Sequence, residues 1–362
     1  MKPRTRVLVI DDSALMRQLL TGILSSDSEI EVVGTAPDPV VARAKIRELR
    51  PDVLTLDVEM PRMDGLQFLE ELMQTHPIPI VMVSSLTERG CDVTLRALEL
   101  GAVDFVSKPK LDMARGVADI GAEIIAKVKA ASLARARRPA GAARAPAGSR
   151  PSKPSHVSFR TTQRFVAIGA STGGTEALMI VLSALPADAP PVVVVQRMPP
   201  AFTRQFAGRL DGRCRVNVSE AKSGDGLVQG HVLIAPGGET HMEVVRSGAN
   251  YAVRLVAAPP VGHHRPSVDV LFDSCAKAAG ANAVGVILTG MGSDGARGML
   301  AMHRTGSVTI AEDESTCVIF GMPKEAIACG AVDHVVPIER VAETMLRAAS
   351  ETMPARGTEE RR

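Results

Sequence analysis

Short apolar runs alternate with longer amphipathic stretches in two long parts of the chain, residues 6–127 and 163–350. Strand-sized runs such as Val7–Ile10 and Val53–Leu56 are followed by helix-sized stretches such as Ser13–Leu24. This alternation is typical of βα units, whose strands form a parallel sheet with helices packed on both faces. We therefore predict an α/β fold for each part, the second being a doubly wound and mainly parallel sheet.

The composition changes between the two parts, over residues 128–160. Within this stretch, Ala130–Arg160 is rich in Ala, Pro, Gly, Ser and Arg, with seven basic residues and no acidic one. Such a segment buries too little apolar surface to fold alone, so we predict a flexible basic linker. The expected domains are then residues 1–127 and 161–352, followed by a disordered tail at 353–362.

One interruption of the pattern in the second part predicts a β-hairpin. The runs Val232–Ala235 and Thr240–Val245 flank Pro236–Glu239, a short Pro- and Gly-containing segment. Two strand-sized runs separated by such a segment are typical of an antiparallel pair joined by a turn. We expect this hairpin in addition to the parallel strands.

Composition excludes several classes of function. The net charge is only +2 and aromatic residues make up 2% of the chain, with no Trp and one Tyr, so no nucleic acid partner is expected. The five cysteines are an odd number without a C-x-x-C pair, which predicts small buried thiols rather than a disulfide framework or zinc site. No apolar run approaches the roughly 18 residues of a membrane helix, so we expect a cytoplasmic protein without membrane insertion.

Three carboxylates stand directly at or after predicted strands of the first part. Asp11 and Asp12 follow Val7–Ile10, and Asp57 follows Val53–Leu56. In open α/β sheets ligands bind at the carboxyl ends of strands, so these side chains should converge. Their mutual repulsion favours a hard cation such as Mg²⁺, which prefers oxygen ligands. A carboxylate beside Mg²⁺ can attack phosphorus and become an aspartyl phosphate.

Two more polar residues stand at strand ends of the same part. Ser84 ends the run Ile80–Val83 and is placed to hydrogen-bond a phosphoryl oxygen, while Lys108 follows Val103–Val106 and is placed to pair with the phosphate. Together and in this order, these residues resemble the receiver domain of two-component systems.

The receiver resemblance spans residues 4–127 and implies a flavodoxin-like fold that a histidine kinase phosphorylates. It makes Asp57 the phosphoacceptor and Ser84 with Phe105 the switch pair. The implied Mg²⁺ ligands are Asp11, Asp12, Asp57 and the backbone carbonyl of Glu59.

The segment Phe165–Ala177 predicts a strand, a tight turn and a helix. Its glycines allow a sharp turn and leave backbone N–H groups open beside the positive end of the helix. Such a turn can cradle a phosphate, or it can present Ser171 for acyl transfer with the N–H groups as an oxyanion hole. The spacing Gly169-x-Ser171-x-Gly173 is that of a nucleophile elbow. A dinucleotide site would need an acid about 20 residues further on, and residues 190–198 contain none, which weakens the cofactor interpretation.

A second Gly-rich loop, Leu288–Gly295, follows another apolar run. Its glycines let the loop fold over the sheet edge, where Asp294 is placed to orient a general base. These two motifs resemble the catalytic domain of the chemotaxis protein-glutamate methylesterase/protein-glutamine glutaminase (CheB) family over about residues 163–350. Three further motifs carry the same resemblance: Val195–Pro199, Ile234–Gly238 and Arg265–Asp269.

This second resemblance implies hydrolysis of glutamate methyl esters, and deamidation of glutamines, on methyl-accepting chemotaxis receptors, without a cofactor for hydrolysis. It makes Ser171 the nucleophile and Asp294 the orienting acid, with backbone N–H groups at Thr172 and Met291 stabilising the oxyanion. Because a switch domain is joined to a hydrolase by one linker, we also predict that the unphosphorylated receiver covers the Ser171 cleft and that phosphorylation uncovers it.

The chain departs from the family pattern at Arg197, which occupies the position of the catalytic histidine. Arginine stays protonated in proteins and therefore cannot accept the serine proton. Three explanations stay open: a change specific to this sequence, a substitute histidine, or a catalytically impaired interaction module controlled by phosphorylation. The candidate substitutes are His241, His263 and His264.

The retained Ser171, Asp294 and glycines favour methylesterase over the interaction module as the function of the lineage. A DNA-binding response regulator is disfavoured, because the second part has strand alternation rather than a helix-turn-helix pattern.

Overall fold

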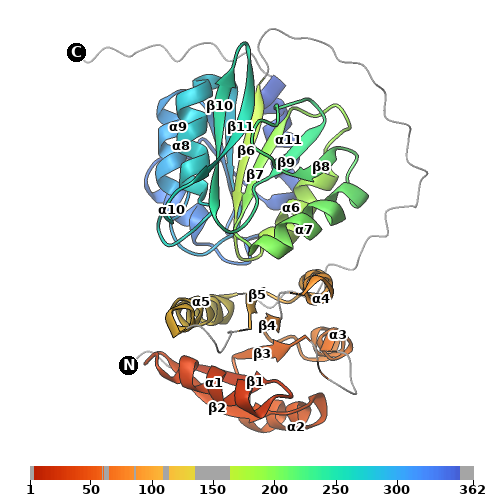
Figure 1. Cartoon of the computed structure of the whole chain (residues 1–362). Helices are drawn as coiled ribbons and strands as arrows, with labels where there is room; N and C mark the ends of the chain where they lie inside the picture. The colour runs from red at the N-terminus through yellow and green to blue at the C-terminus, as the bar shows by residue number, and fades with distance from the viewer. Residues whose placement is uncertain are drawn as a thin grey trace. The chain divides into compact units, whose positions relative to one another are not determined.

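A computed structural model describes residues 4–58, 60, 65–84, 87–108, 114–134 and 164–350. The chain divides into two compact units, residues 1–149 and 150–362, each with its own sheet (Figure 1). The two units are treated separately below.

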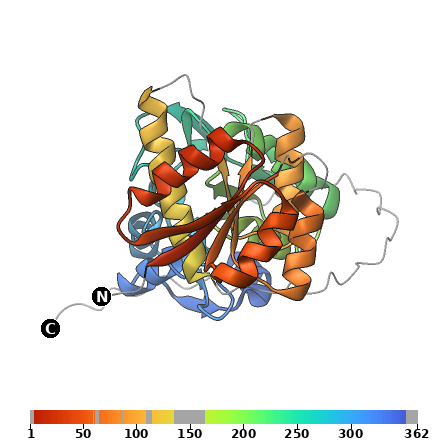
Figure 2. The same ribbon diagram turned by 90° about the horizontal axis from the view of Figure 1, so that it is seen from below.

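The first unit is a five-stranded parallel sheet in the order β2-β1-β3-β4-β5, which confirms the predicted flavodoxin-like fold. Helices cover both faces: α1 and α5 lie on one face and α2, α3 and α4 on the other (Figure 2). The strands are β1 (Thr5–Ile10), β2 (Ile30–Ala36), β3 (Val53–Asp57), β4 (Ile80–Ser84) and β5 (Asp104–Ser107). The helices are α1 (Ala14–Ser25), α2 (Pro39–Leu49), α3 (Gly65–Thr75), α4 (Glu88–Glu99) and α5 (Ala114–Leu133).

Helix α5 continues six residues past the boundary expected at residue 127. Val128, Ala130 and Ala131 are fully or almost fully buried, so this last part of the helix still contributes to the core. Burial of these apolar side chains stabilises helix where composition alone suggested a linker. The rest of the expected linker, from residue 135 on, and the whole of the expected tail at 353–362 lie outside the described residues.

The second unit is a seven-stranded parallel sheet in the order β14-β13-β12-β6-β7-β9-β8, as predicted for a doubly wound fold. Its sheet strands are β6 (Phe165–Ala170), β7 (Val192–Gln196), β8 (Asn217–Glu220), β9 (His231–Ile234), β12 (Ala283–Ile287), β13 (Val308–Glu312) and β14 (His334–Val336). Its helices are α6 (Gly174–Ser183), α7 (Pro200–Arg213), α8 (Val268–Ala279), α9 (Ala296–Arg304), α10 (Met322–Ala328) and α11 (Ile338–Ser350), with a 3₁₀ turn η1 (Gly280–Asn282).

A β-hairpin is present, but its predicted position was wrong. The hairpin is formed by β10 (Thr240–Ser247) and β11 (Asn250–Ala257), joined by a two-residue loop at Gly248. The expected first strand, β9, instead pairs in parallel with β7 and β8. The physical reason is burial: Val232–Ile234 are buried on both faces, as in a central parallel strand, whereas burial in β10 is mixed and fades towards its end.

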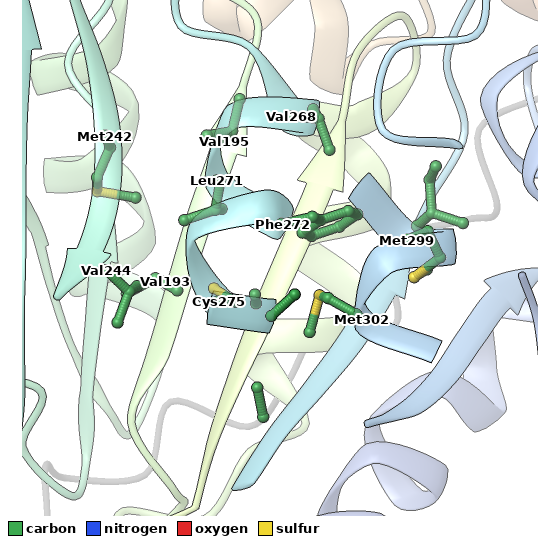
Figure 3. Close-up of a cluster of buried hydrophobic side chains, with 14 of the residues drawn as sticks. Val193, Val195, Met242, Val244, Val268, Leu271, Phe272, Cys275, Met299 and Met302 are labelled. Atoms are coloured by element: carbon green, nitrogen blue, oxygen red, sulfur yellow. The ribbon is translucent and has the colours of Figure 1, made fainter. Parts of the chain in front are cut away.

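Helix α8 packs between the hairpin and helix α9, which fixes the position of its N-terminus (Figure 3). Leu271 of α8 faces Met242 and Val244 of β10, while Phe272 faces Met299 and Met302 of α9 (Figure 3). These side chains are buried, and burial of each large apolar group stabilises the fold by roughly 1.5–3 kcal/mol. The first turn of α8 is thereby held beside the loops that carry the candidate catalytic residues.

The cysteines only partly match the expectation of buried thiols. Cys91, Cys275 and Cys317 are buried and Cys214 is half-buried, but Cys329 is exposed because it lies at the solvent-facing C-terminal end of α10. Burial, together with the charge of Asp211, raises the pKa of Cys214 to about 11. In addition, none of the described helices is long and apolar enough to cross a membrane.

These environments predict one fast-reacting thiol in the native protein at pH 8. The attacking species is the thiolate, so Cys329 should react first with a disulfide reagent, and Cys214 should react slowly until the pH approaches about 11. Peptide mapping by mass spectrometry after timed quenching measures this order, and Cys329→Ser removes the fast phase. Labelling of Cys214 as rapid as that of Cys329 would contradict the prediction.

Candidate functional site

In the first unit, the structure brings together the three predicted carboxylates at the ends of β1 and β3. One oxygen from each of Asp11, Asp12 and Asp57 lies within 4.8 Å of the others. Asp11 and Asp57 are fully buried, and Asp11 Oδ2 has no hydrogen-bond partner among the described residues. A buried carboxylate oxygen without a hydrogen-bond donor, close to two further carboxylates, suits a hard cation, so these oxygen ligands fit Mg²⁺.

Lys108 joins this carboxylate cluster from the end of β5. Its Nζ donates to Asp57 Oδ2 at 2.7 Å and lies 3.5 Å from Asp11 Oδ2. Burial raises the pKa of the Asp11 carboxyl, although the Lys108 charge opposes this. Burial also acts to lower the pKa of Lys108, but Asp57 and Asp11 outweigh it, so the Lys108 pKa is raised. The lysine therefore stays cationic beside the predicted phosphoacceptor.

The other predicted receiver residues lie on the neighbouring strands. Ser84 is buried at the end of β4 and donates to the Gly90 carbonyl at 3.3 Å, and Phe105 is buried in β5 beneath Lys127 Nζ, 5.0 Å from its ring centroid. Their role as a switch pair stays a prediction. Glu59, the predicted carbonyl ligand, lies outside the described residues.

In the second unit, Ser171 occupies the tight turn between β6 and α6. Its N–H donates to the Thr289 carbonyl at 3.1 Å, and its carbonyl accepts from Gly174 N at 2.7 Å and Gln196 Nε2 at 2.9 Å. Gly173 has φ +78°, and a Cβ there would lie 2.5 Å from Val318 Cβ. The turn therefore needs glycine at this position.

The second Gly-rich loop lies directly against Ser171. A Cβ placed on Gly290 would be 2.8 Å from Ser171 Cβ, and Thr289 Oγ1 donates to the Thr172 carbonyl at 3.0 Å. In the described part of the chain, the N–H of Met291 has no hydrogen-bond acceptor. An unused N–H in this loop supports Met291 as an oxyanion donor; for Thr172 and Met291 alike that role stays a prediction.

Sequence reasoning missed the buried carboxylate that holds this loop. Glu312 ends β13, and its Oε2 accepts from the Thr289 N–H at 2.8 Å while its Oε1 accepts from Thr316 Oγ1 at 3.1 Å. The available signal was an acidic residue at the carboxyl end of an apolar strand, the same signal that identified Asp57. Gln196, which holds the Ser171 carbonyl, was quoted only as part of a motif.

Arg197 follows β7 and reaches the hydroxyl of Ser171. Its Nε donates to Ser171 Oγ at 2.8 Å and its Nη2 at 2.6 Å, and Nη2 also donates to the Met291 carbonyl at 2.9 Å. The position that the resemblance assigns to the catalytic base is therefore adjacent to the serine. The group that occupies it here can only donate protons in hydrogen bonds.

Asp294 is buried where its loop meets the first turn of α8. Its Oδ1 accepts from Ser267 Oγ at 2.8 Å and from Asp269 N at 3.0 Å, and its Oδ2 accepts from Val268 N at 3.0 Å. The carboxylate thus caps the helix, where a negative charge is favourable. An orienting role for Asp294 towards residue 197 stays a prediction.

Asp269 makes the reciprocal arrangement at the start of α9. Its Oδ1 accepts from Gly295 N at 3.0 Å and Gly298 N at 2.8 Å. Burial raises the pKa of this carboxyl, and the nearby charge of Asp294 adds to the increase. The two acids therefore tie α8 and the Asp294 loop together from both sides.

Among the described residues, none of the three histidines considered as substitute bases hydrogen-bonds the serine hydroxyl. His241 is 1% exposed; its Nδ1 accepts from Ser267 N at 3.1 Å and its Nε2 lies 3.0 Å from the Pro259 carbonyl, so both nitrogens are used. His263 is exposed and His264 half-buried in the loop before α8. In the described part of the chain, only Arg197 hydrogen-bonds Ser171 Oγ.

A receiver-type carboxylate cluster in one α/β unit and a serine-bearing elbow in the other define a response regulator with a hydrolase-like output domain. The sequence profile of the response regulator receiver domain matches residues 7–119, and that of the CheB methylesterase matches residues 166–345.

Relatives agree over nearly the whole length. A protein-glutamate methylesterase/protein-glutamine glutaminase of Bordetella bronchiseptica is 58% identical over 95% of this chain and 97% of its own, and one of Salmonella typhimurium is 55% identical over 95% and 96%. The crystal structure of the Thermotoga maritima CheB methylesterase catalytic domain aligns with 51% of this chain and 97% of that chain, at 38% identity and TM-score 0.50. The chain belongs to the protein-glutamate methylesterase/protein-glutamine glutaminase family.

Proposed function

We propose that this chain is the phosphorylation-activated methylesterase and glutamine deamidase of chemotactic adaptation, acting on methyl-accepting chemotaxis receptors. The observation that carries the proposal is Ser171 in a strand-to-helix turn against the Gly290–Met291 loop, in a chain whose relatives are named for this activity. In that reaction Ser171 Oγ attacks the ester or amide carbon, and N–H groups at Thr172 and Met291 stabilise the oxyanion. The bond to the methoxy or amino group then breaks, methanol or ammonia leaves, and water hydrolyses the acyl-serine to glutamate and free Ser171.

One observation favours a second function, a phosphorylation-controlled interaction module with impaired turnover. Attack by Ser171 requires its proton to move to a base, and Arg197 cannot accept it. A hydroxyl oxygen has two acceptor lone pairs, and both are engaged by Arg197 N–H groups. In this arrangement the Ser171 hydroxyl therefore keeps its proton, and its oxygen has no free lone pair with which to attack a substrate.

Methanol release from methyl-esterified receptor separates the two functions. Release by the full-length chain that Ser171→Ala abolishes supports the methylesterase. No release above that of Ser171→Ala, with phosphodonor present, supports the interaction module.

The receiver is proposed to control the output domain through Asp57. Asp11, Asp12 and Asp57 would hold Mg²⁺, which neutralises charge on the incoming phosphoryl group. Asp57 attacks the phosphorus, with a histidine kinase as donor, and Lys108 would then transfer its hydrogen bond to a phosphoryl oxygen. Ser84 and Phe105 would then change conformation as the switch pair, and this change in the receiver would raise the activity of the output domain.

Replacing Asp57 by Asn is expected to abolish labelling by acetyl phosphate, because the amide is a poor nucleophile and removes a predicted metal ligand. Intact-protein mass spectrometry measures the added phosphoryl mass. Asp27→Asn is the matched control. Asp27 pairs with Lys129 and lies before β2, at the amino-terminal end of the strands, whereas Asp57 lies at the carboxyl end of β3. Stoichiometric labelling of Asp57→Asn would refute the assignment.

A further inference from the structure

The site around Ser171 is rich in hydrogen-bond donors. Because two Arg197 N–H groups fill the lone pairs of Ser171 Oγ, the hydroxyl can only donate its own proton. Ser171 is 7% exposed, and among the described residues its proton has no acceptor. The Met291 N–H likewise has no acceptor in the described part of the chain. Ser171 is buried and Met291 is half-buried, and a buried donor without an acceptor is costly, so the Ser171 hydroxyl in particular favours a ligand that accepts.

Three backbone acceptors around the same point are already satisfied, whereas Gln196 Oε1 is buried without a hydrogen-bond partner among the described residues. The Ser171 carbonyl accepts from Gly174 and Gln196, the Met291 carbonyl accepts from Arg197, and the Thr172 carbonyl accepts from Thr289. The site therefore offers unused donors next to a guanidinium charge, at the positive N-terminal end of α6. This combination selects an anion over a neutral group.

We infer that the Ser171–Arg197 pair forms a binding site for the carboxylate of a protein glutamate side chain. One carboxylate oxygen would accept from the Ser171 hydroxyl and the other from the Met291 N–H, with the Arg197 charge directly behind. The inference rests on the interaction-module function proposed above and adds its ligand. Protein glutamate is the product of the reaction for which the relatives are named, so the chain would read demethylated receptor instead of producing it.

The charge of the ligand is what this site distinguishes. Glutamine and glutamate methyl ester have nearly the shape of glutamate and a carbonyl acceptor, but neither carries the negative charge that pairs with a guanidinium. Charge-assisted hydrogen bonds are about twice as strong as neutral ones. We therefore expect glutamate to bind on the order of tenfold more tightly than glutamine in otherwise identical partners, with the preference decreasing as salt is raised.

The experiment compares two cytoplasmic receptor fragments that carry Glu or Gln at every modification position. Their affinities for the full-length chain, with Mg²⁺ and acetyl phosphate present, are measured by titration calorimetry. The chain is expected to prefer the Glu fragment, Arg197→His is expected to lose the preference, and Arg197→Lys is expected to keep part of it because the charge remains. Arg204→His is the matched control, since Arg204 is exposed on α7 and pairs with Glu220.

Equal affinity for the two fragments, no binding of the Glu fragment, or an unchanged preference in Arg197→His would each overturn the carboxylate site. Methanol release from esterified receptor is recorded in parallel. Turnover that depends on Ser171 would overturn the underlying interaction-module function, which is a different result from the loss of the glutamate preference.

Discussion

Arg197→His is expected to raise the rate of receptor methyl ester hydrolysis by on the order of 10³-fold or more. The change replaces a permanent donor by a side chain that can accept the Ser171 proton, and removal of one member of a catalytic triad typically costs several powers of ten. It also frees the two lone pairs of Ser171 Oγ that Arg197 now engages. Methanol release per enzyme under phosphodonor measures the effect.

The rest of the site has the capacity to use a restored histidine. A carboxylate offers about four acceptor positions, and Asp294 uses three of them on Ser267, Val268 and Asp269. One position is left for an imidazole N–H, which would set the tautomer of the new base. Arg197 donates to the Met291 carbonyl, but the turn of Ser171 and the start of the Met291 loop are also held by the bonds from Ser171 N to the Thr289 carbonyl and from Thr289 N to Glu312, so they should persist.

Two variants make the result interpretable. Arg197→His combined with Ser171→Ala should return hydrolysis to background, which ties the gain to the serine. Arg197→Gln removes the charge without adding a base and should leave hydrolysis low. If Arg197→His hydrolyses the ester no faster than the parent chain, the missing base at position 197 is not the only defect of the catalytic site, and the single-residue explanation is wrong.

The Arg197→His variant also allows a test of whether the receiver controls hydrolysis by the output domain. If Arg197→His is active, adding Asp57→Asn should remove the increase that acetyl phosphate produces while leaving the unstimulated rate unchanged. An increase that survives Asp57→Asn would show that phosphorylation of Asp57 is not the switch.

The topology was predictable because parallel strands have a strong sequence signal. Runs such as Val192–Val195 are apolar on both faces, and their carboxyl ends carry the polar residues of both sites. The hairpin was misplaced because a Pro- and Gly-containing segment after a strand is compatible with either a turn or a loop, and pairing partners distant in sequence decide between them. The end of α5 was missed because its alanines, which are buried in the core, have the same composition as the Ala-rich linker that follows.

The site was predictable only as far as motifs mark individual residues. Ser171, Arg197 and Asp294 were identified by position, but the direction of their hydrogen bonds depends on segments more than 25 residues apart. Glu312 stands at the carboxyl end of an apolar strand, as Asp57 does, but no neighbouring motif marks it, and its role appears only in the hydrogen bond that it accepts from the Thr289 N–H. Long-range hydrogen bonds of this kind leave little trace in local sequence.

Asp294→Ala is expected to destabilise the output domain by about 3 kcal/mol, because it removes the buried acceptor of three hydrogen bonds at the start of α8. Hydrogen bonds to a charged group contribute roughly 1.5–3 kcal/mol each and helix caps about 1 kcal/mol. Relief of the repulsion with Asp269 offsets part of this loss. Asp294→Asn should lower the free energy of unfolding by less than Asp294→Ala. Its amide oxygen still accepts hydrogen bonds, although its NH₂ group would face backbone donors.

The single tyrosine makes this loss measurable in the full-length chain. Tyr251 is 6% exposed in β11, its ring 5.0 Å from that of Phe165, and the chain has no tryptophan. Tyrosine fluorescence during urea unfolding therefore reports on the output domain alone. Asp273→Ala is the control, since its partly exposed pairing with Arg297 at 3.6 Å should contribute less than about 1 kcal/mol. Equal urea midpoints for Asp294→Ala and Asp273→Ala would mean that the Asp294 carboxylate is not what holds α8 against the loop that carries Met291.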